Sequence, residues 1–302
     1  FREIRKRAKK SPPDVALLID YPGFNIPLAK CLKEAGTRVL YYISPQVWAW
    51  RKSRVQLLSK RIDEMLVVFD FEEEIYQKAG VPVKWVGHPL AEQFQKPYPP
   101  LEGFDRDRPL VALLPGSRKN EIERLMPDMV SAAIQIHSEK PSTQFAIALA
   151  PTIAREKMEE YIRGLPVEIK ILEGKFLPLL QRADAAIVCS GTATLEAGLA
   201  GLPMVIIYKL SPMTAAIARA IFGKPVFGMP NVLLNKQLIP ELIQGEVSGW
   251  NIKEAILRFL NDPEYSKGIR HELSHIRERL GTPGASGRVA DRLINYLEHS
   301  HG

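Results

Sequence analysis

Short apolar runs, each of strand length, alternate with helical segments along most of this chain. In the second half the runs fall at residues 110–114, 145–149, 167–171, 185–189 and 204–208. A strand that is apolar throughout is typical of a sheet buried on both faces. Successive parallel strands need a crossover, which is usually a helix, so the alternation predicts a parallel sheet between layers of helices. We therefore expect an α/β fold.

The first half of the chain carries a second series of the same kind. Expected strands lie at residues 14–20, 37–43, 64–69 and 83–86, and expected helices at residues 27–35 and 72–79. The first strand is mostly apolar, so we expect it to be buried on both faces. Pro27 would open the first helix, because proline suits the first helical position. Two Rossmann-like parallel-sheet domains are therefore expected.

A Pro-rich segment separates the two series. Residues 91–108 lack a clear apolar period, which is typical of a linker. Residues 281–287 then break a helical tail with Gly, Pro and Ser. We expect a first domain over residues 1–107, ending in the linker, and a second domain over residues 108–285. A helix over residues 286–302 would pack back on the first domain.

Composition narrows the class of partner and the compartment. The 302 residues are 46% hydrophobic, and 41 Lys and Arg against 34 Asp and Glu give a net charge of +7. This balance favours an anionic partner such as nucleic acid, anionic lipid or a phosphorylated substrate, but charge alone selects none of them. The two cysteines, Cys31 and Cys189, lie in apolar contexts, which favours a reducing cytoplasm. The sequence shows no bilayer-spanning apolar run, no signal peptide and no metal-ligand spacing of Cys or His.

Residues 183–203 predict a buried strand, a tight turn and a helix of small residues. Ser190, Gly191 and Thr192 supply the turn and the helix cap. The N–H groups and the positive dipole end at the helix start favour an anion such as a phosphate. Glu196, in the first turns, can accept hydrogen bonds from hydroxyls of the kind that a ribose offers. The alternative is an ordinary strand–helix connection with a surface glutamate.

A second candidate anion site follows the strand at residues 110–114. Gly116 permits a tight turn, Ser117 and Arg118 follow it, and Glu121 lies in the helix that begins there. An arginine in this place can form paired hydrogen bonds to a phosphate. The glycines of a dinucleotide fingerprint and the Gly-Lys pair of a Walker loop are absent. The alternative is a helix cap beside a surface arginine.

Three further polar residues lie at strand ends or in loops. Asp20 ends the first expected strand beside a Pro-Gly turn, where an acid can act as a general base or can cap its own turn. His88 also ends a strand, and a histidine in such a place is more often packed or capping than catalytic. Asn231 is a loop amide whose function is not legible from the sequence alone.

Two stretches could contact a membrane surface. Residues 211–226 predict a helix that is apolar nearly all round, with Met213, Ile217 and Phe222 in it, and such a helix is either core or an interfacial helix. The loop that contains Trp48, Trp50 and Arg51 combines aromatic and basic residues. Core is the safer interpretation of the helix, and the loop adds a second amphipathic patch.

Six stretches, taken together and in order, resemble one family. They are residues 19–25 (Ile-Asp-Tyr-Pro-Gly-Phe-Asn), 44–51 (Ser-Pro-Gln-Val-Trp-Ala-Trp-Arg), 87–90 (Gly-His-Pro-Leu), 113–118 (Leu-Leu-Pro-Gly-Ser-Arg), 190–196 (Ser-Gly-Thr-Ala-Thr-Leu-Glu) and 229–234 (Met-Pro-Asn-Val-Leu-Leu). They look like the bacterial lipid-A-disaccharide synthases, and the second stretch is the most specific. That family begins with further Rossmann units. The resemblance therefore implies that residues 1–107 are the remainder of an acceptor-side domain.

The resemblance implies an inverting, metal-free glycosyltransferase of the GT-B type, with two Rossmann-like domains facing a cleft and no cofactor. Its donor would be UDP-2,3-diacylglucosamine and its acceptor 2,3-diacylglucosamine 1-phosphate. The catalytic residues would be Asp20, Arg118 and His88. Asp20 would take the proton of the acceptor 6-hydroxyl, Arg118 would stabilise the departing diphosphate, and His88 would line the cleft. Donor binding would involve Gly116, Ser117, Arg118, Glu121, Ser190, Gly191, Thr192, Glu196 and Asn231. An acyl-chain or membrane surface would involve Trp48, Trp50, Arg51, Met213, Ile217 and Phe222.

The resemblance also implies a cytoplasmic protein, peripheral on the inner membrane, without a nucleic-acid partner; a homodimer is left open. Two alternatives remain from the residues themselves. Another UDP-sugar enzyme, such as a peptidoglycan N-acetylglucosaminyltransferase or a UDP-sugar epimerase, would share the fold and the Glu196 helix. A non-catalytic lipid or phosphate binder is the other alternative, and a change of Asp20 to alanine would then affect stability alone.

Overall fold

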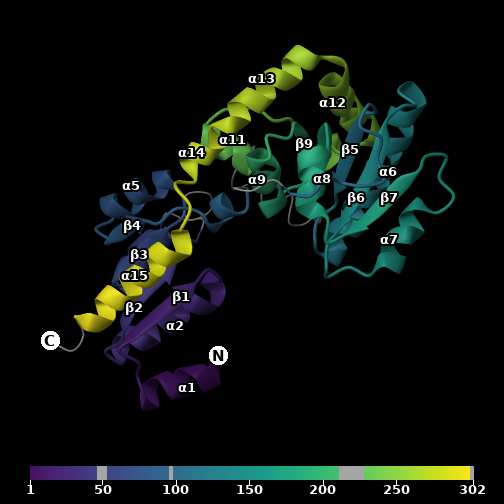
Figure 1. The fold of residues 1–302 in the computed structure, drawn as a ribbon. Helices are drawn as coiled ribbons and strands as arrows, with labels where there is room; N and C mark the ends of the chain where they lie inside the picture. Colours follow the sequence, from purple (N-terminus) through teal and green to yellow (C-terminus); the bar gives the residue numbers. More distant parts are fainter. Residues whose placement is uncertain (46–52, 95–97, 211–227, 300–302) are drawn as a thin grey trace. The chain divides into compact units, whose positions relative to one another are not determined.

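The computed structural model describes residues 1–45, 53–94, 98–210 and 228–299. The chain divides into two compact units, which we describe separately (Figure 1). The first unit comprises Phe1–Gln95 and Arg277–Gly302, and the second comprises Lys96–Ile276. Each unit contains a parallel sheet with helices packed on it, so the predicted α/β fold with two parallel sheets is confirmed.

Within the described part of the first unit, four parallel strands form a sheet in the order β1-β2-β3-β4. The strands are β1 (Val15–Ile19), β2 (Arg38–Tyr42), β3 (Glu64–Val67) and β4 (Val83–Trp85). The helices of this unit include α1 (Arg2–Lys10), α2 (Pro22–Glu34), α4 (Ser53–Ser59), α5 (Asp70–Lys78), η1 (Pro89–Glu92) and α15 (Ala285–Glu298). The core is formed where Val39, Tyr41 and Met65 of the central strands meet Leu28 and Leu58 of the helices.

Two expectations for this unit are wrong. β1 is only partly buried, with Ile19 exposed, because it is the edge strand of the described sheet and lacks a neighbour there on one side. Helix α2 begins at Pro22, not at Pro27. Pro22 takes the first helical position, where its missing N–H costs nothing, and Pro27 lies inside the helix.

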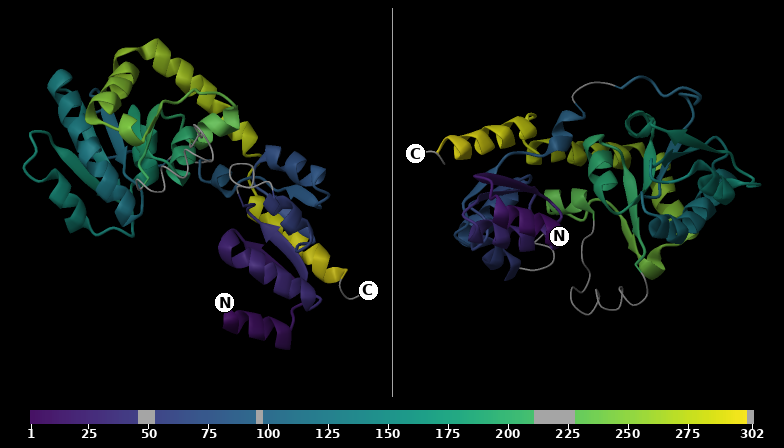
Figure 2. Two further views of the ribbon diagram at one scale, coloured as in Figure 1. Left: turned by 180° about the vertical axis from the view of Figure 1, so that it is seen from behind. Right: turned by 90° about the horizontal axis from the view of Figure 1, so that it is seen from below.

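Helix α15, the last helix in the sequence, contacts β1 and β2 of the first sheet (Figures 1 and 2). Its Arg292 makes two hydrogen bonds to the Glu64 carboxylate of β3, with Nε–Oε2 3.1 Å and Nη2–Oε1 2.7 Å. The Glu64 side chain is only 5% exposed. A paired guanidinium is the partner that a buried carboxylate needs, so Arg292 connects α15 to the start of β3, a central strand of this sheet.

Within the described part of the second unit, six parallel strands form a sheet in the order β10-β9-β8-β5-β6-β7. The strands are β5 (Leu110–Leu114), β6 (Gln144–Leu149), β7 (Ile169–Glu173), β8 (Ala185–Cys189), β9 (Met204–Tyr208) and β10 (Glu241–Ile243). The helices include α6 (Lys119–Glu139), α7 (Arg155–Ile162), α8 (Phe176–Arg182), α9 (Thr192–Leu199), α11 (Met229–Leu234), α12 (Gly249–Asn261) and α13 (Pro263–Ser274). The short edge strand β10 was not expected from the sequence, because its residues are only half-buried.

The strand order of the second sheet reverses between β5 and β8. From β5 the chain moves outward through β6 and β7, and it then returns to the other side of β5 with β8. Ligands of open parallel sheets bind at such a switch point, outside the carboxyl ends of the strands. The turns that follow β5 and β8 are the two candidate anion sites.

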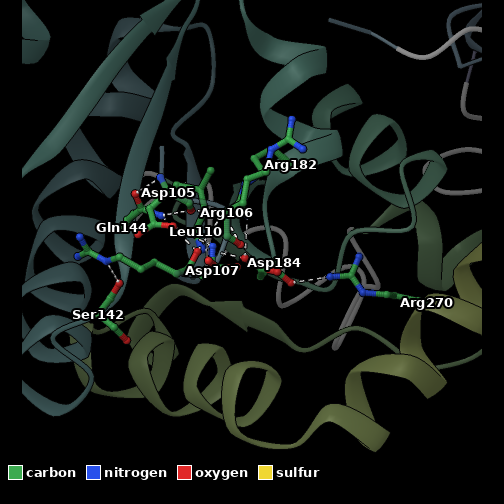
Figure 3. Close-up of polar contacts among 10 residues, drawn as sticks. Asp105, Arg106, Asp107, Leu110, Ser142, Gln144, Arg182, Asp184 and Arg270 are labelled. Atoms are coloured by element: carbon green, nitrogen blue, oxygen red, sulfur yellow. Dashed lines mark hydrogen bonds and ion pairs between the residues drawn. The ribbon is translucent and has the colours of Figure 1, made fainter. Parts of the chain in front are cut away.

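At the opposite, amino-terminal edge of the second sheet, Arg182 donates hydrogen bonds to backbone and carboxylate oxygens (Figure 3). Arg182 donates from Nη2 to the carbonyl oxygens of Asp105 at 2.6 Å and Arg108 at 2.9 Å, and from Nη1 to Asp184. Asp184 in turn accepts the N–H of Leu110 at 2.9 Å. The segment that leads into β5 is thereby fixed at the edge away from the switch point.

Candidate active site

The turn after β5 brings together Gly116, Arg118 and Glu121. Gly116 has φ +100°, a conformation that strains any other residue, and a Cβ on it would lie 2.8 Å from Oε2 of Glu121. Arg118 donates from Nη1 to Oε1 of Glu121 at 2.8 Å, and this partner raises the pKa of the guanidinium. The arginine side chain is 81% exposed, whereas that of Glu121 is 20% exposed. The carboxylate therefore holds a largely exposed guanidinium at the start of α6.

Ser117 is exposed on the same turn, and its carbonyl oxygen accepts a hydrogen bond from the Thr152 hydroxyl at 2.7 Å. This bond fixes the turn from the loop that follows β6. The Ser117 hydroxyl and the Arg118 guanidinium are then both presented at the carboxyl edge of the sheet.

The turn after β8 starts helix α9. Gly191 is its N-cap residue with φ +153°, and no side chain among the described residues caps the helix start. Thr194 donates from its hydroxyl to the Gly191 carbonyl oxygen at 2.7 Å, while Thr192 is exposed. Ser190 is half-buried between strand and turn. The N–H groups of the first helical turn are the groups that an anion would take.

Glu196 lies one turn into α9 and is half-buried. The described residues provide no hydrogen bond to its carboxylate, and burial raises its pKa to about 7. A carboxyl group in this state gains from hydroxyl donors that a ligand brings, because they would replace its lost hydration.

Asn231 is placed differently from the other donor-side residues. Its Nδ2 donates to the Ile239 carbonyl oxygen at 2.9 Å and to Glu241 at 2.7 Å, and its Oδ1 accepts the N–H groups of Leu238 and Ile239. The side chain is buried and all the hydrogen-bonding groups of the amide are used. Asn231 therefore fixes the loop between α11 and β10, and sequence reasoning missed its partner Glu241.

At the carboxyl edge of the first sheet, Asp20 follows β1 and its carboxylate is exposed. Asp20 and Tyr21 have φ +45° and +43°, and Ile43, which follows the neighbouring strand β2, has φ +63°. Left-handed conformations are unfavourable for residues other than glycine, and such positions gather at functional sites. The left-handed conformation of Tyr21 and Ile43 carries no signal in the sequence.

His88 lies at the same edge, after β4. Its Nδ1 accepts the Leu90 N–H at 3.1 Å and so caps helix η1. Burial lowers its pKa to about 4, so the ring is neutral near pH 7 and its proton is on Nε2. The ring lies 5.3 Å from that of Phe69, between centroids. The histidine is thus a cap whose Nε2–H remains as a neutral donor.

The residues expected at an acyl-chain or membrane surface, Trp48, Trp50, Arg51, Met213, Ile217 and Phe222, lie outside the described residues. In the part of the chain that is described, no helix combines the length and the apolar character needed to cross a membrane. Nor do His, Cys, Asp and Glu side chains gather there in threes as potential metal ligands.

The fold of most of this chain is shared with solved UDP-GlcNAc 2-epimerases and glycosyltransferases. The UDP-GlcNAc 2-epimerase from Neisseria meningitidis bound to UDP-GlcNAc matches 97% of this chain and 80% of its own, with a TM-score of 0.63 at 13% identity. Spinosyn rhamnosyltransferase SpnG matches 96% of this chain and 76% of its own, with a TM-score of 0.57 at 15% identity. At such low identity these likenesses show the fold alone, which is that of the GT-B enzymes.

Sequence comparison gives the family. A family model described as lipid-A-disaccharide synthetase matches residues 1–286. The lipid-A-disaccharide synthase of Trichlorobacter lovleyi is 40% identical over 305 residues, which cover 99% of this chain and 80% of that protein. The enzyme of the same name from Coxiella burnetii is 39% identical over 312 residues, which cover 98% of this chain and 81% of that protein. The chain therefore belongs to the lipid-A-disaccharide synthetase family, the glycosyltransferases that form the disaccharide of lipid A.

Proposed function

We propose that this chain joins UDP-2,3-diacylglucosamine to 2,3-diacylglucosamine 1-phosphate and releases UDP. The acceptor 6-hydroxyl oxygen forms a β-1,6 bond to the anomeric carbon of the donor, with inversion, while the bond from that carbon to the diphosphate oxygen breaks. The electron pair of the broken bond goes to the diphosphate, and the hydroxyl proton goes to a base. The observation that carries the proposal is the switch point of the second sheet, where two helix starts, Arg118 and Glu196 are gathered.

The donor is proposed to bind at this switch point. Its diphosphate would take the N–H groups at the starts of α6 and α9, together with Arg118 and Ser117. Its ribose hydroxyls would donate to Glu196, whose carboxyl group has no hydrogen bond from the described residues. Glu121 and Asn231 would act without touching the donor, the first by holding Arg118 and the second by fixing the loop before β10.

The acceptor is proposed to bind on the first unit, with Asp20 as the base. Its carboxylate is exposed at the carboxyl edge of the sheet, which is where a substrate hydroxyl can reach it. His88 would contribute a neutral hydrogen-bond donor through Nε2, since its pKa of about 4 keeps the ring uncharged near pH 7.

Turnover and UDP binding in four variants test these roles. We expect Asp20→Asn to bind UDP normally and to form disaccharide at least about a hundredfold more slowly, the scale of a lost general base. Asp14→Asn, which makes the same change at the other end of β1, should keep its rate. Arg118→Ala should weaken UDP binding by about 1–3 kcal/mol and also slow turnover, whereas Arg163→Ala should do neither. Normal turnover in Asp20→Asn would place the base elsewhere.

We further propose that the protein acts at the surface of the inner membrane, because both substrates carry acyl chains. The described feature that supports this is α1, whose Arg2, Arg5, Lys6, Arg7, Lys9 and Lys10 are all exposed. Exposed apolar side chains, Ile4 and Tyr21, belong to the same unit. Basic residues beside apolar ones are typical of helices that bind anionic lipid.

Co-sedimentation with vesicles tests the membrane proposal. The protein should bind phosphatidylglycerol vesicles at low salt and be released at high salt, because screening weakens the attraction of Lys and Arg. Arg5→Glu with Lys9→Glu should reduce binding more than Lys84→Glu with Lys267→Glu, which changes the charge equally at other exposed sites. Equal losses in the two double variants would contradict a role for α1.

A further inference from the structure

The turn that carries Asp20 is strained and is nevertheless well fixed. Asp20 and Tyr21 both adopt the left-handed conformation, which costs a residue other than glycine on the order of 1–2 kcal/mol. Two such residues in succession relax to ordinary angles unless their surroundings hold them. Something in this unit must therefore stabilise the turn.

Two side chains from different elements supply that stabilisation. Asn25 of α2 donates from Nδ2 to the carbonyl oxygens of Ile19 at 2.9 Å and Asp20 at 2.7 Å. Tyr41 of β2 donates its hydroxyl to the same Asp20 oxygen at 2.7 Å. Asn25 is 8% exposed and Tyr41 is fully buried, so both donors are themselves held by packing. The Asp20 carbonyl is thus fixed from two sides.

We propose that Asn25 and Tyr41 are positioning residues that hold the Asp20 carboxylate in its reactive direction. The inference rests on the proposed function, in which Asp20 is the base. The described residues give no hydrogen bond to the Asp20 carboxylate itself, so its direction depends on the backbone of the turn. With the carbonyl fixed and φ left-handed, the Cα–Cβ bond has one direction, and the carboxylate is presented at the carboxyl edge of the sheet. Misplacement of a reacting group by about 1 Å can cost a hundredfold in rate.

The decisive variant is Tyr41→Phe, which removes one oxygen atom and keeps the buried ring. We expect kcat to fall about tenfold or more while the KM values and UDP affinity stay as they are, because the substrates still bind. Asn25→Ala should have the same effect. Tyr42→Phe is the matched control: the Tyr42 hydroxyl is also buried in β2 but has no hydrogen-bond partner among the described residues. Its kcat should be unchanged.

Two combinations separate positioning from a general loss of structure. Glycine adopts the left-handed conformation readily, so Tyr21→Gly should restore part of the kcat lost in Asn25→Ala. Tyr41→Phe should add nothing to the loss in Asp20→Asn if it acts through Asp20. A further tenfold loss in that double variant, or unchanged kcat in both Tyr41→Phe and Asn25→Ala, would overturn the inference. Fast turnover of Asp20→Asn alone would instead refute the proposed function, so the two failures are distinguishable.

Discussion

The carboxyl groups of Asp20 and Glu196 lie in opposite environments. Asp20 is exposed on a turn after β1, whereas Glu196 is half-buried in α9 and has its pKa raised to about 7 by burial. Near neutral pH the Glu196 carboxyl group is therefore protonated in about half of the molecules. The protonation state of this residue should respond to any ligand that donates hydrogen bonds to it.

The pH dependence of UDP binding tests this consequence. If ribose hydroxyls bind the ionised carboxylate, UDP lowers the Glu196 pKa, and affinity is present above pH 7 and lost as the pH falls through 7. From pH 8 to pH 6 the affinity should fall about tenfold through this group. Glu196→Gln should bind UDP more weakly and lack this component, while Glu156→Gln, an exposed control, should keep it. Calorimetry at several pH values measures each; equal profiles for wild type and Glu196→Gln would exclude the ribose role.

For single residues, the sequence identified candidates for the site but not their hydrogen bonds or backbone conformations. Glu196 and Arg118 could be found from strand-turn-helix patterns, because the helix start has a sequence signature. The hydrogen bonds that occupy the Asn231 amide could not be predicted from the sequence, because they involve backbone groups of residues 238 and 239 and the Glu241 side chain. The left-handed backbone conformation of Asp20 and Tyr21 could not be predicted either, because side-chain hydrogen-bond donors from α2 and β2 maintain it.

Among the elements, α15 is joined to the first sheet by the pairing of Arg292 with the buried Glu64 carboxylate. Arg292→Met keeps most of the bulk of the side chain but leaves the Glu64 carboxylate, 5% exposed, without its guanidinium. We expect a loss of about 3–5 kcal/mol in the free energy of unfolding, because a buried charge remains uncompensated. Lys30→Met, which breaks an exposed pair with Glu34, should cost about 0–1 kcal/mol. Urea unfolding compares them; equal losses would show that Arg292 contributes no more than a surface charge.

Most strands could be predicted from the sequence, whereas a short edge strand and the start of a helix could not. β5, β8 and β9 have the expected bounds because apolar runs end at turn residues. β10 is short and half-buried and has no such run, and α2 starts earlier because Pro22 serves as its first residue. Periodicity in sequence reports burial, so it is weakest where an element lies at the edge of its sheet.

At the scale of the molecule, the second unit is continuous in sequence and the first is not. The second unit, Lys96–Ile276, contains its sheet, its switch point and the proposed donor residues. We therefore expect a fragment of residues 96–276 to fold and to bind UDP with an affinity within about threefold of that of the whole chain, an energy difference of less than about 1 kcal/mol. A fragment of residues 1–95 should be less stable than one that also has residues 277–302, because α15 and Arg292 are missing. Circular dichroism and calorimetry test both; an unfolded 96–276 fragment would contradict the first expectation.

The pairing of Arg292 with Glu64 also has a consequence for synthesis on the ribosome. The two residues are 228 positions apart, and at about 5–20 residues per second this separation means a delay of roughly 10–50 s between their appearances. During that interval the second unit emerges and can fold, while the Glu64 carboxylate has already been synthesised but lacks the Arg292 guanidinium. The synthesis of the first unit therefore begins before that of the second unit and ends after it. A nascent chain arrested before residue 285 should therefore be bound by chaperones through its first sheet, and one in which residues 285–298 have left the ribosome should be released.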